Sequence, residues 1–484
     1  MKRVFFPLLM AITLLGSAGC NEQDPAEEIL GTKYYANMFA FNIMQVYYLW
    51  EADVADGFKD WTYSVDPKEK VRSMRYKENG KEVDKWTSLT DNFESYLGSV
   101  TGNTKSFGME FKLYYADSSR KKIQAVVTFT YAGSPAEKAG LKRGDTILTL
   151  DGKEITAENY SSLVSETLYG GGTVKLGLDS GKTVSLTAVQ MYEDPVHTVS
   201  TMTVGGKKIG YLHFTSFTMD ACRDLEPVFR TFQDYGIEEL VLDLRYNGGG
   251  YTITGQVLAS MLAPLQEVSA HSVFNKEVYN KTLTEAFKDE LETCFAEEIE
   301  VQQSTSSTIT YTVYPAQVNP DIRKLWVITT GSTASASESL ICGLKPYMDV
   351  YTVGERSYGK FCGGYLISAE AFFKSITGES ASEIDCEEGK AKTQNWGIYV
   401  MCSRYSDKDG ATLSMPDGIP AQYEVQDNPL DGHQLGDPEE TMLSYVLSLA
   451  TGTTVKAPLA QPDLMPAPAL HRPGFGLLIN NKTL

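Results

Sequence analysis

Two short segments of the sequence carry residues that could perform nucleophilic chemistry. One is TASASE, residues 333–338, where two hydroxyls and a carboxyl stand among small residues. The other ends in Gly359-Lys360. A serine hydroxyl attacks a carbonyl carbon when a base removes its proton, and a neutral lysine can be that base. These residue types point to acyl transfer if the fold brings the two segments together.

The TASASE segment lies between an apolar stretch, residues 325–330, which predicts a strand, and residues 338–344, which predict a helix. The N–H after an attacking hydroxyl in such a turn can stabilise a tetrahedral oxyanion by about 3 to 4 kcal/mol. The same residues also suit a plain helix cap, with Ser335 or Ser337 as the cap and Glu338 in the first turn. The segment alone allows both interpretations.

A third segment, NGGG at residues 247–250, follows the mostly apolar stretch EELVLDLRY. Consecutive glycines let a backbone turn tightly and present N–H groups to an incoming oxygen. A flexible loop would have the same composition, so this segment by itself does not decide between the two.

The elements that would position these segments alternate between strand and helix from Gly210 onward. The stretch 210–217 predicts a strand, 220–237 an amphipathic helix and 238–246 a second strand, and the scheme repeats around residues 325–344. This alternation indicates an α/β layer architecture, in which chemistry collects at the carboxyl ends of strands. All three segments follow such strands.

Composition excludes several classes of protein. The chain has 484 residues and a net charge of -19, with no run of Lys and Arg, which disfavours a nucleic-acid partner. Its 42% hydrophobic content supports packed cores, and its length suggests several domains. There is no CxxC or HExxH motif and only five histidines, so we predict no metal site and no cofactor. The cysteine spacings predict no particular disulfide.

The N-terminus is typical of an export signal. Lys2 and Arg3 precede an apolar run and then small residues up to Cys20. Residues 1–20 resemble a bacterial lipoprotein signal, which implies cleavage before Cys20 and lipidation of that cysteine. An uncleaved anchor or an ordinary secretory peptide is the alternative. Residues 21–100, with apolar positions at helical spacing, predict a helical domain.

Residues 101–192 resemble a PDZ domain, on the strength of GSPAEKAGLKRGD at 133–145, the apolar strand after it and a DGK turn at 151–153. In that family a short turn, here Phe107-Gly108-Met109, offers N–H groups to the C-terminal carboxylate of a polypeptide that adds as an edge strand. A module that packs only against its neighbours is the alternative.

The rest of the pattern resembles the S41 serine peptidases of the C-terminal processing type, specifically lipoproteins of this type from Bacteroidetes. The motifs appear in order as GYLHF at 210–214, LDLRYNGGG at 242–250, TASASE, and a lysine 25 residues after its first serine. The resemblance implies that Ser335 is the nucleophile and Lys360 the general base. It also implies that the N–H groups of Ala336 and Gly250, with Gly249 adjacent, form the oxyanion hole.

One position departs from the family pattern. A glutamine that orients the lysine often follows it by four residues, but here that position is Gly364. No third catalytic residue can be assigned, although a backbone carbonyl could orient Lys360 and Glu338 could support the site. Lys360 has to be largely neutral to act as a base, so its pKa must fall from about 10.4 to about 7 or 8. We therefore expect Lys360 to be buried and unpaired.

The resulting expectation is a multidomain α+β protein, an exported and lipid-anchored serine endopeptidase that acts on polypeptides. Its parts are a signal (1–20), a helical domain (21–100), a PDZ domain (101–192), a catalytic domain of the ClpP/crotonase type implied by the resemblance (193–456) and a Pro-rich tail (457–484). It would sit in the cell envelope, on the periplasmic or surface face of the outer membrane or on the inner membrane. A catalytically silent peptide-binding protein and a small-ester hydrolase are the alternatives, and a histidine base such as His213 is disfavoured.

Overall fold

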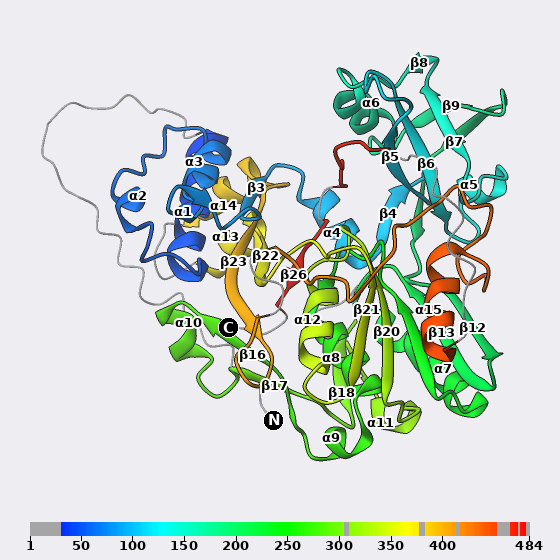
Figure 1. Cartoon of the computed structure of the whole chain (residues 1–484). Helices are drawn as coiled ribbons and strands as arrows, with labels where there is room; N and C mark the ends of the chain where they lie inside the picture. The colour runs from blue at the N-terminus through cyan, green and yellow to red at the C-terminus, as the bar shows by residue number, and fades with distance from the viewer. Residues whose placement is uncertain are drawn as a thin grey trace, which may run out of the picture.

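A computed structural model describes residues 31–303, 309–376, 383–412, 417–452, 465–472 and 475–480. The predicted signal and Cys20 therefore lie outside the described residues. Within them, no helix combines the length and the apolar character needed to cross a bilayer. The chain is a multidomain α+β protein, as the sequence predicts, with the PDZ module at the upper right of Figure 1. Below it lies the part that the sequence predicts to be catalytic, residues 193–456, which we call the catalytic region.

A mainly parallel sheet forms the centre of the catalytic region. Its order is β12 (Val196–Val204), β13 (Lys207–Phe214), β14 (Glu239–Asp243), β20 (Lys324–Thr329), β21 (Asp349–Gly354) and β24 (Tyr423–Glu424). Only the pairing of β12 with β13 is antiparallel. Because β13, β14, β20 and β21 run the same way, the segments that follow β14, β20 and β21 emerge at one edge of the sheet.

Helices cover both faces of this sheet, which explains why its strands are apolar at successive positions. On one face Leu240 and Leu242 pack with α7 (Ala221–Tyr235), α8 (Thr252–Leu262) and α12 (Ala336–Leu344). On the other face Val241 packs with α15 (Thr441–Thr451). Short elements α9 (Leu265–Ser269), β18 (Ile299–Gln302), β19 (Thr310–Val313) and α11 (Pro315–Val318) complete this region.

A second sheet lies beside the first and includes distant parts of the chain. Its order is β15 (Gly250–Tyr251), β26 (Leu478–Ile479), β22 (Cys362–Ser368), β23 (Gly397–Ser406), β16 (Val273–Tyr279) and β17 (Glu292–Cys294), and β3 (Ser88–Thr90) pairs with β23. Helix α10 (Lys281–Ala286) follows β16. The glycine segment and the C-terminal segment therefore meet in one sheet.

The N-terminal helices do not form a separate core. Residues from α1 (Thr32–Tyr47) share one hydrophobic cluster with β22, β23 and α13 (Ala369–Ser375), and Tyr35 donates to Glu388 of α14 (Glu383–Lys392) at 2.8 Å. The other elements here are α2 (Ala55–Lys59), α3 (Pro67–Ser73), α4 (Phe93–Thr101), β1 (Lys77–Glu78) and β2 (Lys81–Glu82). The predicted helices are present, but they pack as part of the catalytic region.

The PDZ module is an antiparallel sheet of β5 (Met109–Tyr115), β6 (Ile123–Thr130), β7 (Thr146–Leu150), β8 (Lys153–Glu154), β9 (Thr173–Leu178) and β10 (Thr183–Thr187). It carries α5 (Pro135–Lys138) and α6 (Tyr160–Thr167), and β4 (Asn103–Ser106) pairs with β11 (Val189–Tyr192). Helix α5 lies within GSPAEKAGLKRGD and begins with Pro135 in its first turn and Ser134 Oγ accepting from Glu137 N. A further strand, β25 (Met465–Pro466), joins β5 from the C-terminal segment.

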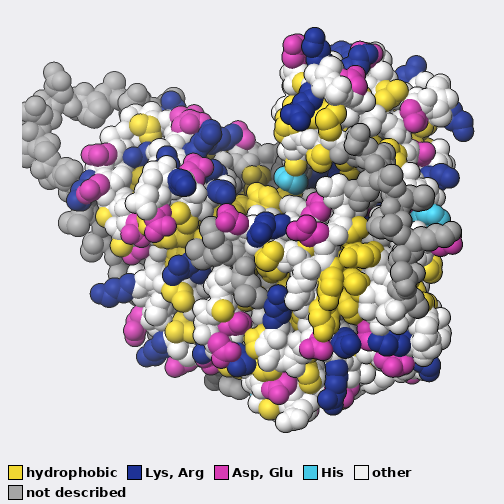
Figure 2. All heavy atoms as spheres, viewed as in Figure 1, with side chains coloured by type: hydrophobic (Ala, Val, Ile, Leu, Met, Phe, Trp, Pro, Cys, Tyr) yellow, Lys and Arg dark blue, Asp and Glu magenta, His cyan; other side chains and the backbone are white. Residues whose placement is uncertain are grey.

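The surface shown in Figure 2 mixes acidic and basic side chains and has no continuous basic area on that face. This agrees with the net charge of -19 and the absence of a basic run in the sequence. The same view shows a hollow between the N-terminal helices at the left and the PDZ module at the upper right. No disulfide links the cysteines in the described part of the chain.

Candidate active site

Ser335 lies where the sequence placed it, on the turn between β20 and α12. It is the N-cap of α12 and has a φ of 66°, in the left-handed region that residues with a Cβ seldom adopt. Its side chain is fully buried, and Oγ has no hydrogen-bond partner in the described chain. Ser335 is in a capping-box position, but a plain helix cap requires neither an unpartnered Oγ nor a strained backbone.

The glycine segment packs directly against this turn. Asn247 joins the two, because its carbonyl accepts from Ala334 N at 3.0 Å and from Ser337 Oγ at 3.2 Å. A Cβ on Gly249, which has a φ of 107°, would lie 2.7 Å from the Cβ of Ser335. Glycine is thus required at position 249 for two reasons. Residues with a Cβ rarely adopt this φ, and a Cβ here would collide with Ser335.

The N–H groups of this segment are not equivalent. Gly249 N donates to Asn247 Oδ1 at 2.8 Å, so it is already engaged in this state. Gly250 begins β15 beside the serine turn, and Ala336 N is at the first position of α12, where helical N–H groups have no partner within the helix. Of the three sequence-predicted oxyanion residues, Ala336 and Gly250 are therefore better placed as donors than Gly249.

Lys360 is fully buried, as the sequence analysis expects of a general base. Burial lowers the pKa of its ammonium to about 8, although nearby Cys362, Asp84 and Glu338 raise it. Its Nζ donates to Tyr399 Oη at 2.7 Å and to the carbonyl of Gly476 at 2.5 Å. Lys360 has no ion pair with any described residue under 4 Å.

Glu338 connects the serine and lysine segments more directly than a first-turn acid would. Its buried carboxylate accepts from Ser335 N at 2.9 Å, from Gly359 N at 2.8 Å and from Lys360 N at 2.8 Å. It also accepts from Ser357 Oγ. Burial raises the pKa of Glu338 to about 7, against the effect of these hydrogen bonds. One side chain thus fixes the backbones that carry Ser335 and Lys360, which makes it a positioning residue.

Tyr399 of β23 occupies the place that the sequence analysis left unassigned. Its ring lies 3.0 Å from the position that a Cβ on Gly364 would take, so a side chain at 364 and this ring would compete for one space. The hydroxyl accepts from Lys360 Nζ, and burial raises the pKa of Tyr399 far above its ordinary value, which keeps the phenol neutral. No sequence motif indicates this role, because residue 399 is distant from all of the motifs.

The Tyr399→Phe variant should lower kcat for polypeptide cleavage about tenfold, with a smaller change in KM. Among the hydrogen bonds of this hydroxyl, the one from Lys360 Nζ orients the proposed base, and its loss costs about 1 to 2 kcal/mol. Tyr365→Phe is a matched control, because the hydroxyl of Tyr365 on β22 has no partner among the described residues. Equal kinetics for the two variants would contradict a positioning role for Tyr399.

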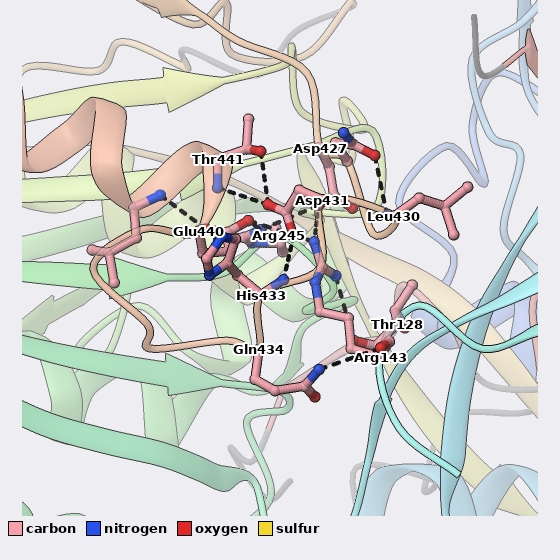
Figure 3. Close-up of polar contacts among 12 residues, drawn as sticks. Thr128, Arg143, Arg245, Asp427, Leu430, Asp431, His433, Gln434, Glu440 and Thr441 are labelled. Atoms are coloured by element: carbon pink, nitrogen blue, oxygen red, sulfur yellow. Dashed lines mark hydrogen bonds and ion pairs between the residues drawn. The ribbon is translucent and has the colours of Figure 1, made fainter. Parts of the chain in front are cut away.

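A buried ionic network anchors the strand that leads into the glycine segment (Figure 3). Arg245, two residues before Asn247, is fully buried and donates to Glu440 Oε1 at 2.6 Å and to Asp427 Oδ1 at 3.1 Å. Arg143 of the PDZ module donates to the same Asp427 oxygen at 2.8 Å. The network therefore links the PDZ module to the residues that immediately precede the glycine segment.

The predicted carboxylate-binding turn, Phe107-Gly108-Met109, is at the start of β5. Phe107 and Met109 are buried in the PDZ core, and Gly108 N donates to Ser106 Oγ at 3.0 Å. The N–H of Gly108 is therefore engaged in this state. A cavity of about 450 Å³ extends from β5 to Gly249 and Gly250, so the PDZ module and the glycine segment open onto one space.

Two family models match the chain. Residues 208–425 match Peptidase family S41, and residues 126–168 match the PDZ domain. The S41 match spans TASASE, the glycine segment and Lys360, and the PDZ match precedes it along the chain. Both families are those that the sequence motifs resemble.

Individual relatives agree with this assignment. The carboxy-terminal processing protease CtpB of Bacillus subtilis is 26% identical over 282 residues, which cover 57% of this chain and 52% of that protein. The chloroplastic C-terminal processing peptidase of Tetradesmus obliquus is also 26% identical over 282 residues, covering 54% of this chain and 52% of that protein. The chain thus matches about half the length of these relatives.

The fold is also that of a solved structure. A Bacteroides fragilis protein assigned to the S41 proteases superposes with a TM-score of 0.60 at 22% identity, covering 86% of this chain and 98% of that one. This similarity extends beyond the segment that matches the family models and includes most of the described chain.

Proposed function

We propose that this protein is a serine endopeptidase of the C-terminal processing type that cuts exported polypeptides with Ser335 and Lys360. The observation that carries the proposal is a pair of buried side chains, Ser335 and Lys360, whose backbone N–H groups both donate to Glu338. One is a hydroxyl without a partner on a strained turn, and the other is a lysine whose pKa burial lowers to about 8. A strained turn and a buried lysine both cost stability, and both suit general-base activation of a serine.

The reaction would proceed through an acyl-enzyme. Neutral Lys360 takes the proton of Ser335 Oγ while Oγ bonds to the scissile carbonyl carbon, and the N–H groups of Ala336 and Gly250 stabilise the oxyanion. Lys360 then gives that proton to the leaving amine as the C–N bond breaks. Lys360 then takes a proton from water as the water oxygen bonds to the ester carbonyl carbon. The bond from that carbon to Ser335 Oγ breaks, Lys360 returns the proton to Oγ, and the new carboxyl terminus leaves.

The pH profile follows from the pKa of Lys360. Only the neutral amine accepts a proton, and a group with a pKa of about 8 is neutral in about a tenth of molecules at pH 7. Cleavage measured as kcat/KM should therefore rise about tenfold from pH 7 to a plateau above about pH 9, with an apparent pKa near 8. A flat profile between those values would contradict a lysine base. Lys360→Met should remove both the activity and this pH dependence.

The direct test is cleavage of an unstructured polypeptide by the chain without residues 1–20, with the fragments identified by mass spectrometry. We expect internal peptide bonds to be cut and new carboxyl termini to appear. An absence of fragments over the whole pH range, from protein whose fold is confirmed by circular dichroism, would refute the endopeptidase assignment. Hydrolysis of small esters without cleavage of polypeptides would favour an esterase instead.

We further propose that the chain is exported and anchored to the cell envelope through a lipid on Cys20, and that the PDZ module recognises polypeptide substrates through their C-termini. The export signal in residues 1–20 supports the first proposal. The PDZ match supports the second, as does β5, whose edge accepts an extended segment, β25, as an added antiparallel strand. Labelling with a radioactive fatty acid, compared with Cys20→Ala, tests the anchor.

A further inference from the structure

The C-terminal segment of the chain passes through both the PDZ module and the catalytic region. Residues 465–472 lie beside β5, and residues 475–480 lie between β15 and β22 as β26. Figure 1 draws both parts in red, one next to the PDZ sheet and one in the centre of the molecule. In the sequence this segment is recognisable only as part of a Pro-rich tail.

In the PDZ module the segment binds as a peptide ligand would. Met465 and Pro466 pair antiparallel with Tyr115 and Tyr114 of β5, and Ala467 N donates to the carbonyl of Leu113 at 3.0 Å. On the opposite side of the groove, just after α6, Tyr169 Oη donates to the carbonyl of Leu470 at 2.9 Å. Addition of an edge strand, with side chains packed on the module, is the usual way in which PDZ domains hold a polypeptide.

Arg472 fastens the segment at the end of that groove. Its guanidinium donates to the carbonyl of Met109 at 3.1 Å and to Glu193 Oε2 at 2.9 Å, and it pairs with Glu110 Oε1 at 2.8 Å. The segment runs toward the Phe107-Gly108-Met109 turn, but it continues past this turn rather than ending there. A bound polypeptide can therefore extend from the PDZ groove toward Ser335.

In the catalytic region the segment lies across the proposed machinery. The carbonyl of Gly476 accepts from Lys360 Nζ, and the Leu477 carbonyl lies 3.0 Å from the position that a Cβ on Gly249 would take. Leu478 pairs in parallel with Gly250 and is only 3% exposed. Its side chain packs in the main core with the first residue of α12, Ala336.

These contacts explain why the serine and the lysine are not joined in this state. Lys360 Nζ donates to the tail carbonyl and to Tyr399, while Ser335 Oγ has no partner in the described chain. Tyr399 also holds the tail, because its Oη donates to the Leu478 carbonyl at 2.8 Å and accepts from Leu478 N at 3.0 Å. The groups that would act on a substrate are occupied by the chain itself.

We propose that residues 465–472 and 475–480 are an intramolecular ligand, the first of the PDZ groove and the second of the catalytic cleft. This ligand traces the path of a polypeptide substrate and has to leave before that substrate is cut. This inference rests on the proposed peptidase function. It defines the substrate class as an extended polypeptide with small or apolar residues in the PDZ groove, as at Ala467 and Leu470, and apolar residues in the cleft, as at Leu477 to Ile479.

Occupancy is tested without any catalytic activity, by amide hydrogen exchange in the full chain carrying Ser335→Ala. The amides of Ala467, Leu478 and Asn480 donate to Leu113, Tyr399 and Gly364 and should be protected. Adding Arg472→Glu, which places a third acid beside Glu110 and Glu193, should speed their exchange about tenfold or more. The matched control is Arg230→Glu, an equal charge change on the exposed face of α7, which should leave these amides unchanged.

Obstruction is tested by polypeptide cleavage in the chain with Ser335 intact. Arg472→Glu should raise the rate about tenfold, and Arg230→Glu should not change it. Exchange of the tail amides at the rate of an unstructured peptide would overturn occupancy. Two results would overturn obstruction. One is faster exchange of the tail amides in Arg472→Glu without faster cleavage, and the other is cutting of the segment itself by the parent. If no variant cuts any polypeptide while the tail amides remain protected, the peptidase assignment fails, and the substrate path fails with it.

Discussion

Replacement of Ser335 by alanine should reduce polypeptide cleavage by a factor on the order of 10³ or more and leave the fold intact. The loss of activity follows from removing the only atom proposed to bond to the substrate. The fold should be unaffected because Oγ makes no hydrogen bond in the described chain, so its removal leaves no buried partner unsatisfied. Cleavage rate and thermal unfolding of the same preparations measure the two effects.

Ser337 provides a matched control within the same segment. It is also buried, but its Oγ donates to the carbonyl of Asn247, so Ser337→Ala should cost about 1 kcal/mol of stability and change the cleavage rate only a few-fold. Ser335→Ala is therefore expected to lose activity without losing stability, and Ser337→Ala is expected to lose stability with little loss of activity. A comparable loss of activity in both, or full activity in Ser335→Ala, would contradict Ser335 as the nucleophile.

The motifs in the sequence predicted the elements that carry the site because each motif combines a local structural signal with a chemical one. An apolar strand followed by small residues and a helix places Ser335 at a strand end, and the same reasoning applies to the glycine segment. The burial of Lys360 followed from the requirement that a base be neutral, and the structure confirms that burial. The PDZ module was predicted from the resemblance of GSPAEKAGLKRGD, the apolar strand after it and the DGK turn, and the structure has a helix and a strand at these positions.

The parts that the sequence did not predict depend on contacts between distant residues. Tyr399 reaches Lys360 from a strand 39 positions away, and Gly364 provides the space for its ring. The N-terminal helices share a core with β22 and β23, because a helical apolar pattern specifies a buried face but not what covers it. The C-terminal segment joins two sheets through only two short strands, β25 and β26, which are too short for periodicity to indicate.

Glu338 shows how one residue type can have two local interpretations. A first-turn acid beside a serine is typical of a capping box, and the carboxylate does accept from the backbone N–H of Ser335. Its further contacts with Gly359 N and Lys360 N come from a turn 21 and 22 residues later. The two interpretations are therefore compatible, because the carboxylate that caps the helix also connects the segments of the proposed nucleophile and the proposed base.

Replacement of Arg245 by methionine should lower the free energy of unfolding at neutral pH by about 3 to 5 kcal/mol, because it leaves buried carboxylates without their main positive partner. Arg245 is fully buried and contacts Asp243, Asp427 and Glu440. Arg230→Met, on the exposed face of α7, is the control and should change stability by less than about 0.5 kcal/mol. Urea unfolding measures both.

The effect of Arg245→Met should depend on pH in a defined direction. Burial alone would raise the pKa of Glu440, but the charge of Arg245 and its hydrogen bonds hold that pKa below its ordinary value. The pKa of Asp427 is likewise depressed, since Arg143, Lys112 and Arg245 together outweigh its burial. Carboxylates with a depressed folded pKa contribute stability that is present above their unfolded pKa, near 4, and is lost as the pH falls through the folded pKa.

Without Arg245 the pKa values of both carboxylates should rise, so they can become protonated and neutral at a higher pH. The stability difference between the parent and Arg245→Met should therefore be largest near pH 7 and should shrink as the pH falls toward about 4.5. A difference that stays constant over this range would mean that the variant loses packing rather than charge compensation. The network anchors the strand leading into the glycine segment, so the cleavage rate of Arg245→Met should fall together with its stability at neutral pH. At low pH the cleavage rate should recover less than stability does, because Lys360 is protonated there.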